Sequence, residues 1–300
     1  MEVTMPGVHP SRRRFLAGAA GAGFAAVVAT TGAGRVIAEP AGQPGIRTRL
    51  AGVPVSQASV RAWERRRVPI AAVRLLRDHP GVAAGELRAL VDRGSVAPSD
   101  LPAARADLAR TRDRLGADRI REMLAPETAI AGAATLVAKA ASGGRWAIAD
   151  TEITAPRGTA EGMAEWFTRE RTTDDRPTWT GACPDHYVIV TGRDGRQEVI
   201  EVTGGAVLPL RFFVDYADVG AVPIPRDPTY PLEVAGTASL ATGEMIGGVR
   251  HQFRTLPGGG FRSRLRVAFP AAVPGLYVTE HQWHLAVEFG NWVDAYLASA

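Results

Sequence analysis

The chain has 300 residues, of which 46% are hydrophobic and 22% charged, a composition typical of a globular protein with one or two domains and a sizeable core. Its formal net charge is +4, but Arg12, Arg13, Arg14 and Arg35 fall within the first 38 residues, which leaves 31 basic and 30 acidic residues in the remainder. A nearly neutral body gives no support to nucleic-acid binding. The single cysteine, Cys183, excludes an intramolecular disulfide and a zinc site built from cysteines.

Residues 1–38 have the organisation of an export signal. The run Ser11–Leu16 (SRRRFL) resembles the twin-arginine (Tat) signal, Ser/Thr-Arg-Arg-x-Phe-Leu-Lys, with Ala17 in place of the lysine. An Ala/Gly-rich apolar run follows to Gly34, and Val36–Ala38 offers a cleavage site. The resemblance implies that the Tat machinery exports the folded protein from the cytoplasm. An uncleaved membrane anchor is the alternative. No later segment reaches 18 apolar residues, so the mature chain is expected to span no membrane.

Residues 39–55 are rich in glycine and proline and are interpreted as a linker. Residues 56–182 are predicted to be a helical region that packs on a sheet. Helix boundaries follow from capping residues, proline and glycine, and part of 145–180 stays without an assignment. The predicted helices are a short one that opens at 59–64 and stops near Pro69, then 70–78, 85–92, 99–124 with an interruption at Gly116, 128–141 and 160–171.

From Cys183 onward the hydrophobic period changes to two, and residues 183–300 are predicted to form an antiparallel sheet with a C-terminal helix. Asp194-Gly195 between two alternating runs indicates a hairpin with a two-residue loop. That register places Tyr187 on a wholly apolar face and makes His186 and Glu201 diagonal neighbours on the other face. The six predicted strands are 187–191, 197–203, 210–216, 232–240, 245–255 and 261–269.

The last helix, expected over 276–297, carries a polar stripe beside an apolar one. His281, His284, Glu288 and Asn291 recur at helical spacing. A stripe in this position either meets solvent or lines a cavity. His281, His284 and Glu288 are candidate ligands for zinc or iron, although no cofactor is required by the sequence.

Together these elements predict an α+β fold, with N-terminal helices followed by a curved sheet of about six strands and a long C-terminal helix. In element order, residues 183–298 resemble START/polyketide-cyclase-like ligand-binding domains, and less closely the cone-shaped SnoaL/NTF2-like domains. Helices that should interrupt the early strands are absent here or displaced toward the N-terminus. The resemblance implies a cavity between sheet and helix that holds a small molecule.

Two further groups of residues are candidates for acid–base chemistry. Asp185, His186 and Glu201 place carboxylates beside an imidazole in the first hairpin, which raises the basicity of the imidazole. His251 lies on an apolar strand face and is expected to point inward, toward His284. A structural role is the competing interpretation for each group. The function hypotheses are an exported protein that binds an apolar small molecule, a cofactor-free isomerase, cyclase or hydrolase, a metalloprotein, and a protein that binds partners through its N-terminal helices.

Overall fold

The computed structural model describes residues 45–173, 175–204 and 206–299. The predicted export signal over residues 1–38 therefore lies outside the described residues. The described chain has an α+β fold, as the sequence predicts. No helix within the described residues is long and apolar enough to cross a membrane.

One antiparallel sheet of nine strands forms the frame of the molecule, with the order β2-β1-β3-β9-β8-β7-β6-β5-β4. All six predicted strands are present in it, in the predicted order and followed by a long helix. The strands are β1 Arg47–Leu50, β2 Val53–Val55, β3 Trp146–Ala155, β4 His186–Thr191, β5 Gln197–Glu201, β6 Leu210–Asp215, β7 Leu232–Ser239, β8 Met245–Thr255 and β9 Phe261–Pro270.

Three strands were not predicted. β1 and β2 form a small hairpin inside residues 39–55, the segment that was predicted to be a linker. Ala51 and Gly52 join the two strands, and both have a positive φ. β3 fills part of the unassigned stretch and pairs with β9 along its whole length. Its inward positions include Ala149 and Thr151, too small or too polar to produce a clear alternation of hydrophobicity. The sheet is therefore wider at this edge than the sequence indicates.

Within the described residues, seven α-helices and two single 3-10 turns accompany the sheet. The helices are α1 Gln57–Leu76, α2 Leu87–Arg93, α3 Leu101–Leu115, α4 Ala117–Ala141, α5 Ala160–Thr173, α6 Arg176–Gly181 and α7 Gly275–Ser299, and the 3-10 turns are Pro80–Val82 and Pro98–Asp100. The predicted break at Gly116 is present between α3 and α4.

The prediction that a helix stops near Pro69 was wrong, because α1 continues through that proline. A proline inside a helix costs about 3 kcal/mol. Buried residues on both sides of it, among them Trp63, Val68 and Leu75, pack into the core and offset that cost. Pro126 is likewise accommodated in α4, which joins two segments that were predicted as separate helices.

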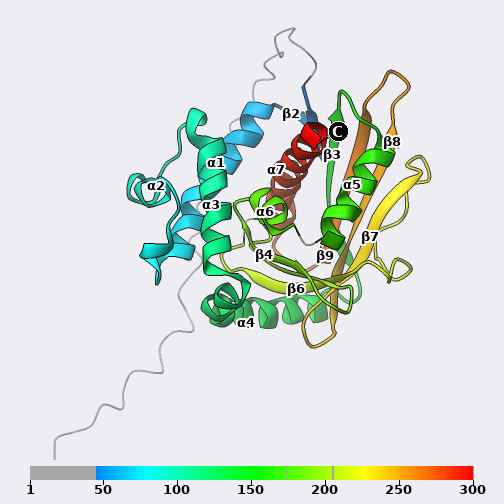
Figure 1. The fold of residues 1–300 in the computed structure, drawn as a ribbon. Coiled ribbons are helices and arrows are strands. Elements are labelled where there is room, and N and C mark those ends of the chain that lie inside the picture. Colours follow the sequence, from blue (N-terminus) through cyan, green and yellow to red (C-terminus); the bar gives the residue numbers. More distant parts are fainter. Residues whose placement is uncertain (1–44, 174, 205, 300) are drawn as a thin grey trace, which may run out of the picture. The chain divides into compact units, whose positions relative to one another are not determined.

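The sheet curls around α7, which lies on its concave face beside α5 and α6 (Figure 1). Helices α1, α2 and α3 pack together at the β4 side of the sheet, and α4 runs along the outside of β6. One core cluster lies between the concave face and α7. A second cluster joins α1–α4 to the opposite face of the β4–β5 hairpin. The helix α7 is thus enclosed on nearly all sides.

The register of the β4–β5 hairpin differs from the prediction. Thr191 pairs with Gln197, so five residues lie in the loop where two were predicted. A β-bulge at Tyr187 then makes His186 pair directly with Glu201. Because of the bulge, Tyr187 and Val188 both face the helices, and the predicted single apolar face is not formed.

Candidate functional site

The polar stripe of α7 points into the molecule. His281, His284, Glu288 and Asn291 are all buried, and the ring of His284 has no exposed surface. The sheet covers one side of the helix, while Cys183 and Trp63 cover part of the other side. Of the two alternatives that the sequence leaves open for this stripe, contact with solvent or the lining of a cavity, the burial of these four side chains excludes the first.

Two residues of the β4–β5 hairpin meet two residues of α7 in the interior. The Nε2 atom of His186 lies 3.0 Å from Nε2 of His284 and 3.0 Å from Oε2 of Glu288. The Oε2 atom of Glu201 lies 3.6 Å from Nε2 of His186 and 3.7 Å from Nε2 of His284. Within α7, Nε2 of His284 lies 3.4 Å from Oε2 of Glu288, one helical turn away. We call these four side chains the buried quartet.

The two carboxyl groups of the quartet differ in their electrostatics. Burial raises the pKa of Glu288, but hydrogen bonds with His186 and His284 outweigh burial and hold the pKa well below its ordinary value. Burial also raises the pKa of Glu201, and there the two imidazoles compensate only partly, so its pKa lies above the ordinary value. The pKa values of two neighbouring buried carboxyl groups are thus shifted in opposite directions. Such opposite pKa shifts are common in functional sites.

His284 is held as a cation in this environment. Burial lowers its pKa, but the neighbouring Cys183 and Glu201 raise it, and the net result is a pKa well above its ordinary value. Burial raises the pKa of the Cys183 thiol to about 11, so this thiol is neutral near pH 7. The carboxylates of the quartet are therefore what stabilises the imidazolium at neutral pH.

A layer of arginines and backbone groups positions the β4 end of the quartet. The Nδ1 atom of His186 lies 3.0 Å from the carbonyl oxygen of Trp179, which fixes the ring. Arg67 of α1 donates two hydrogen bonds of 2.8 and 2.9 Å to the two carboxylate oxygens of Asp185, which is fully buried. Arg112 of α3 donates to backbone carbonyls just before β4. The N-terminal helices thus anchor the segment that carries His186.

Asp185 was predicted to accompany His186 directly, yet its carboxylate pairs with Arg67 instead. This ion pair and the contact between Cys183 and His284 were not predicted from the sequence. The Cys183 sulfur lies 3.8 Å from Nδ1 of His284, on the edge of the ring opposite to the quartet. The sequence indicates this ion pair only through the residue types, because an arginine lies on a predicted helix and an aspartate lies shortly before a predicted strand.

His281 and His251 lie beside the quartet, each packed against aromatic rings. The ring of His281 stacks on His284 at 4.9 Å between centroids and meets the edge of Phe269. The ring of His251 lies 4.6 Å from that of Phe289. Both imidazoles have a buried Nδ1 atom without a hydrogen-bond partner, and burial lowers the pKa of His251 to about 4. The inward direction expected for His251 agrees with these contacts.

Apolar side chains next to the quartet retain some accessible surface although they lie on the concave face of the sheet. They belong to β6, β7, β8 and β9 and pack against the buried core around α7. The side chains of Glu201 and Glu288 are 8% and 10% exposed, whereas both histidine side chains of the quartet have no exposure. We call this region the inner apolar face; it comprises Phe212, Val234, Val249, Val267 and Phe269.

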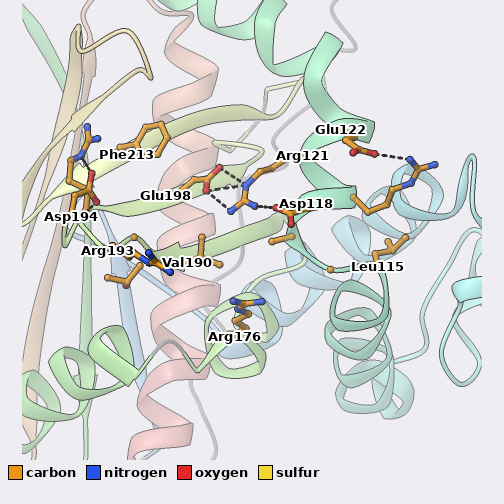
Figure 2. A pocket seen from close by; sticks show the side chains of 16 residues that line it. Leu115, Asp118, Arg121, Glu122, Arg176, Val190, Arg193, Asp194, Glu198 and Phe213 are labelled. Atoms are coloured by element: carbon orange, nitrogen blue, oxygen red, sulfur yellow. Dashed lines mark hydrogen bonds and ion pairs between the residues drawn. The ribbon is translucent and has the colours of Figure 1, made fainter.

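A pocket of about 740 Å³ lies elsewhere, between the start of α4 and the β4–β5 loop (Figure 2). No residue of the quartet lines it. Its charged groups largely pair with one another. Arg121 extends between Glu198 and Asp118, and Arg196 pairs with Asp194. The pocket is therefore a poorer candidate for a specific ligand than the quartet.

Comparison with known proteins gives no family for the chain. No protein-family model matches the sequence, and no curated protein matches it. Among solved structures, the chain is similar to the crystal structure of Ara h 8.0201, with 18% sequence identity and a TM-score of 0.32, over 51% of this chain and 99% of that chain. A similarity of this degree defines neither a family nor a ligand.

Proposed function

We propose that this protein binds a small apolar molecule between the concave face of the sheet and α7. The observation that carries the proposal is the inner apolar face, whose side chains stay partly accessible although they pack against the core around α7. Ligand sites in proteins commonly combine an apolar lining with a few convergent polar groups. The quartet would then contact a polar group of the bound molecule.

The buried Nδ1 atoms of His251 and His281 support the same proposal. An unpaired polar atom in the interior costs about 1–3 kcal/mol. A bound molecule that carries a hydrogen-bonding group would remove part of that cost. The expected ligand is therefore apolar over most of its length and polar at the end that approaches α7.

Binding can be tested with an uncharged fluorescent probe such as N-phenyl-1-naphthylamine, together with native mass spectrometry of the purified protein. The wild type should bind one probe or carry a co-purified molecule. Val249→Trp, which fills the inner apolar face, should weaken probe binding at least about tenfold. Val137→Trp, at a residue 70% exposed on α4, is the matched control and should bind normally. A wild-type protein that binds no probe and carries no molecule would refute the proposal.

The same quartet could perform acid–base chemistry on the bound molecule, because each imidazole lies within 3.0–3.7 Å of the other imidazole and of both carboxyl groups. Incubation of an extracted ligand with the protein in deuterium oxide measures this. Deuterium should enter the ligand with the wild type and not with Glu288→Gln. A ligand that binds but never gains deuterium would leave binding as the function.

We further propose that the Tat pathway exports the protein. The support is the run Ser11–Leu16 with the apolar segment that follows it. Replacing Arg12 and Arg13 together with lysine should retain the protein in the cytoplasm. Unchanged export of this variant, measured by fractionation, would contradict the proposal.

A further inference from the structure

The quartet brings four potential metal-ligand atoms to one point. Five distances among Nε2 of His186, Nε2 of His284, Oε2 of Glu201 and Oε2 of Glu288 lie between 3.0 and 3.7 Å. Zinc binds imidazole nitrogen and carboxylate oxygen at about 2.0–2.2 Å, which places neighbouring ligand atoms of a tetrahedral site about 3.3–3.6 Å apart. Three of the five distances lie within about 0.1 Å of this range and the two of 3.0 Å are about 0.3 Å shorter, so the spacing is close to that of a tetrahedral coordination shell.

Hydrogen bonds alone satisfy this arrangement poorly. The carbonyl oxygen of Trp179 can only accept, so Nδ1 of His186 carries a hydrogen and donates to it. The Nε2 atom of His186 can carry at most one further hydrogen, yet it faces Nε2 of His284 and the Oε2 atoms of both carboxylates. The two Nε2 atoms lie 3.0 Å apart, so either they share one hydrogen or two N–H groups oppose each other, whereas one cation can meet all four atoms.

From this geometry we infer that His186, Glu201, His284 and Glu288 bind a divalent first-row transition-metal ion, with zinc as the best fit. Two imidazoles and two carboxylates suit zinc, and also iron or manganese. Two carboxylates balance the charge of a divalent ion, which lowers the cost of enclosing it in the interior. The hydrogen bond from His186 to a backbone carbonyl is the kind that orients metal-bound histidines.

Among the residues that the structure describes, there is one competing ligand set. Cys183, His186 and His284 each offer an atom within 4.8 Å of the others. The sulfur, however, lies against Nδ1 of His284, while Nε2 of that ring faces the carboxylates. A cation among the Nε2 atoms would therefore use both glutamates and leave the thiol out. Cys183 thus provides a control variant that separates the two sets.

The proposed metal ligands are not residues of the inner apolar face, so metal binding and probe binding can be measured and disrupted separately. The exposed part of Glu201 and Glu288 leaves the carboxylate side of the site as the side that a bound molecule could approach. Val249→Trp should therefore weaken probe binding while metal binding remains, and a failure of one proposal does not count as a failure of the other.

The test starts from full-length wild-type protein dialysed against a chelator and titrated with Zn²⁺ by calorimetry and with Co²⁺ by visible absorption. We expect one ion per chain, and a cobalt spectrum of tetrahedral intensity without a thiolate-to-metal band. Glu201→Gln and Glu288→Gln should weaken binding at least about 100-fold, whereas Cys183→Ser should change it less than about threefold. Circular dichroism checks that each variant folds.

Two results would overturn the inference. The first is a wild-type protein that binds none of Zn²⁺, Co²⁺, Fe²⁺ or Mn²⁺ in 1:1 stoichiometry. The second is binding that is lost in Cys183→Ser and kept in Glu288→Gln, which would assign the ion to the thiol and the two imidazoles. The wild-type cobalt spectrum needs no variant, so the inference stays testable even if a substitution prevents folding.

Discussion

Replacing His251 with leucine removes an imidazole whose protonation the fold opposes. The ring packs against Phe289 and Phe167, and it is 5% exposed. Burial is the main cause that lowers its pKa, from 6.5 to about 4, with Glu288 raising it and Arg266 lowering it to smaller extents. Since the side chain lies outside the quartet, its replacement leaves the proposed ligand atoms in place.

The sign of the effect follows from which state binds the proton first. Above pH 6.5 the imidazole is neutral in both the folded and the unfolded chain, and it contributes no pH dependence. As the pH falls, the unfolded chain is protonated near pH 6.5 while the folded chain resists until about pH 4. The unfolded state is therefore stabilised in this window, and at pH 4.5 the wild type should have lost about 2–3 kcal/mol through this group.

The free energy of unfolding in urea, measured at pH 7.5 and at pH 4.5, tests this reasoning. His251→Leu should lose about 2–3 kcal/mol less than the wild type between the two pH values. His251→Phe differs from leucine in packing but is equally uncharged, so it should show the same difference whatever its absolute stability. If the wild type and both variants lose equal free energy to within about 0.5 kcal/mol, the fold does not oppose protonation of His251.

Three further outcomes follow from contacts around the site. Asp185→Ala should destabilise the protein by about 3–5 kcal/mol in urea unfolding, since it leaves Arg67 without its buried partner. The Cys183 thiol, with its pKa raised from 9.0 to about 11 by burial, should react with a disulfide reagent at pH 8 at least about 100-fold more slowly in the folded than in the unfolded protein. Gly260→Ala should cost about 1–3 kcal/mol more than Gly259→Ala in unfolding free energy, because both have positive φ but only the former would collide with a β3 carbonyl. Equal losses at the two glycines, a mild Asp185→Ala, or a thiol that reacts readily in the folded state would each contradict the corresponding contact.

The sequence predicted those elements in which polar and apolar residues alternate with a clear period. β9 alternates apolar residues with Arg262, Arg264 and Arg266, and this period of two is visible without a structure. The helix α7 was predicted from its apolar and polar stripes. The two hairpin strands β1 and β2 were missed because they have four and three residues, too few for a periodic signal. The six strands from β9 to β4 were therefore predictable from their periodicity, and the three strands at the β2 side of the sheet were not.

For the candidate site, the residue types in the sequence were enough to select candidate residues, but the sequence did not show which of them lie close together in space. His186 and Glu201 were selected from the hairpin, and His284 and Glu288 from the last helix, as separate groups. That they meet depends on α7 lying across the β4–β5 hairpin, a contact between segments about 100 residues apart. No local pattern reports such a contact. For the same reason the sequence could not separate His281, which stacks on His284, from the residues whose ligand atoms converge.

The bulge at Tyr187 is the irregularity that makes the quartet possible. In a regular strand the side chains of His186 and Val188 would lie on the same face of the sheet. If His186 pointed toward α7, Val188 would point there too. With the extra residue, Tyr187 and Val188 both pack under the N-terminal helices, while His186 and Ile189 face the interior. Bulges commonly re-aim a side chain next to a functional site.

The surroundings of the bulge explain why it persists. A bulge interrupts the ladder hydrogen bonds, so neighbouring contacts must compensate. Arg74 donates to the Tyr187 hydroxyl at 3.0 Å, and Arg67 holds Asp185 directly before the strand. Helix α1 supplies both arginines, so the helix that covers the outside of the hairpin also determines which side chain points inside. Contacts from helix α1 thus help to position the residues of the quartet, although no residue of α1 belongs to it.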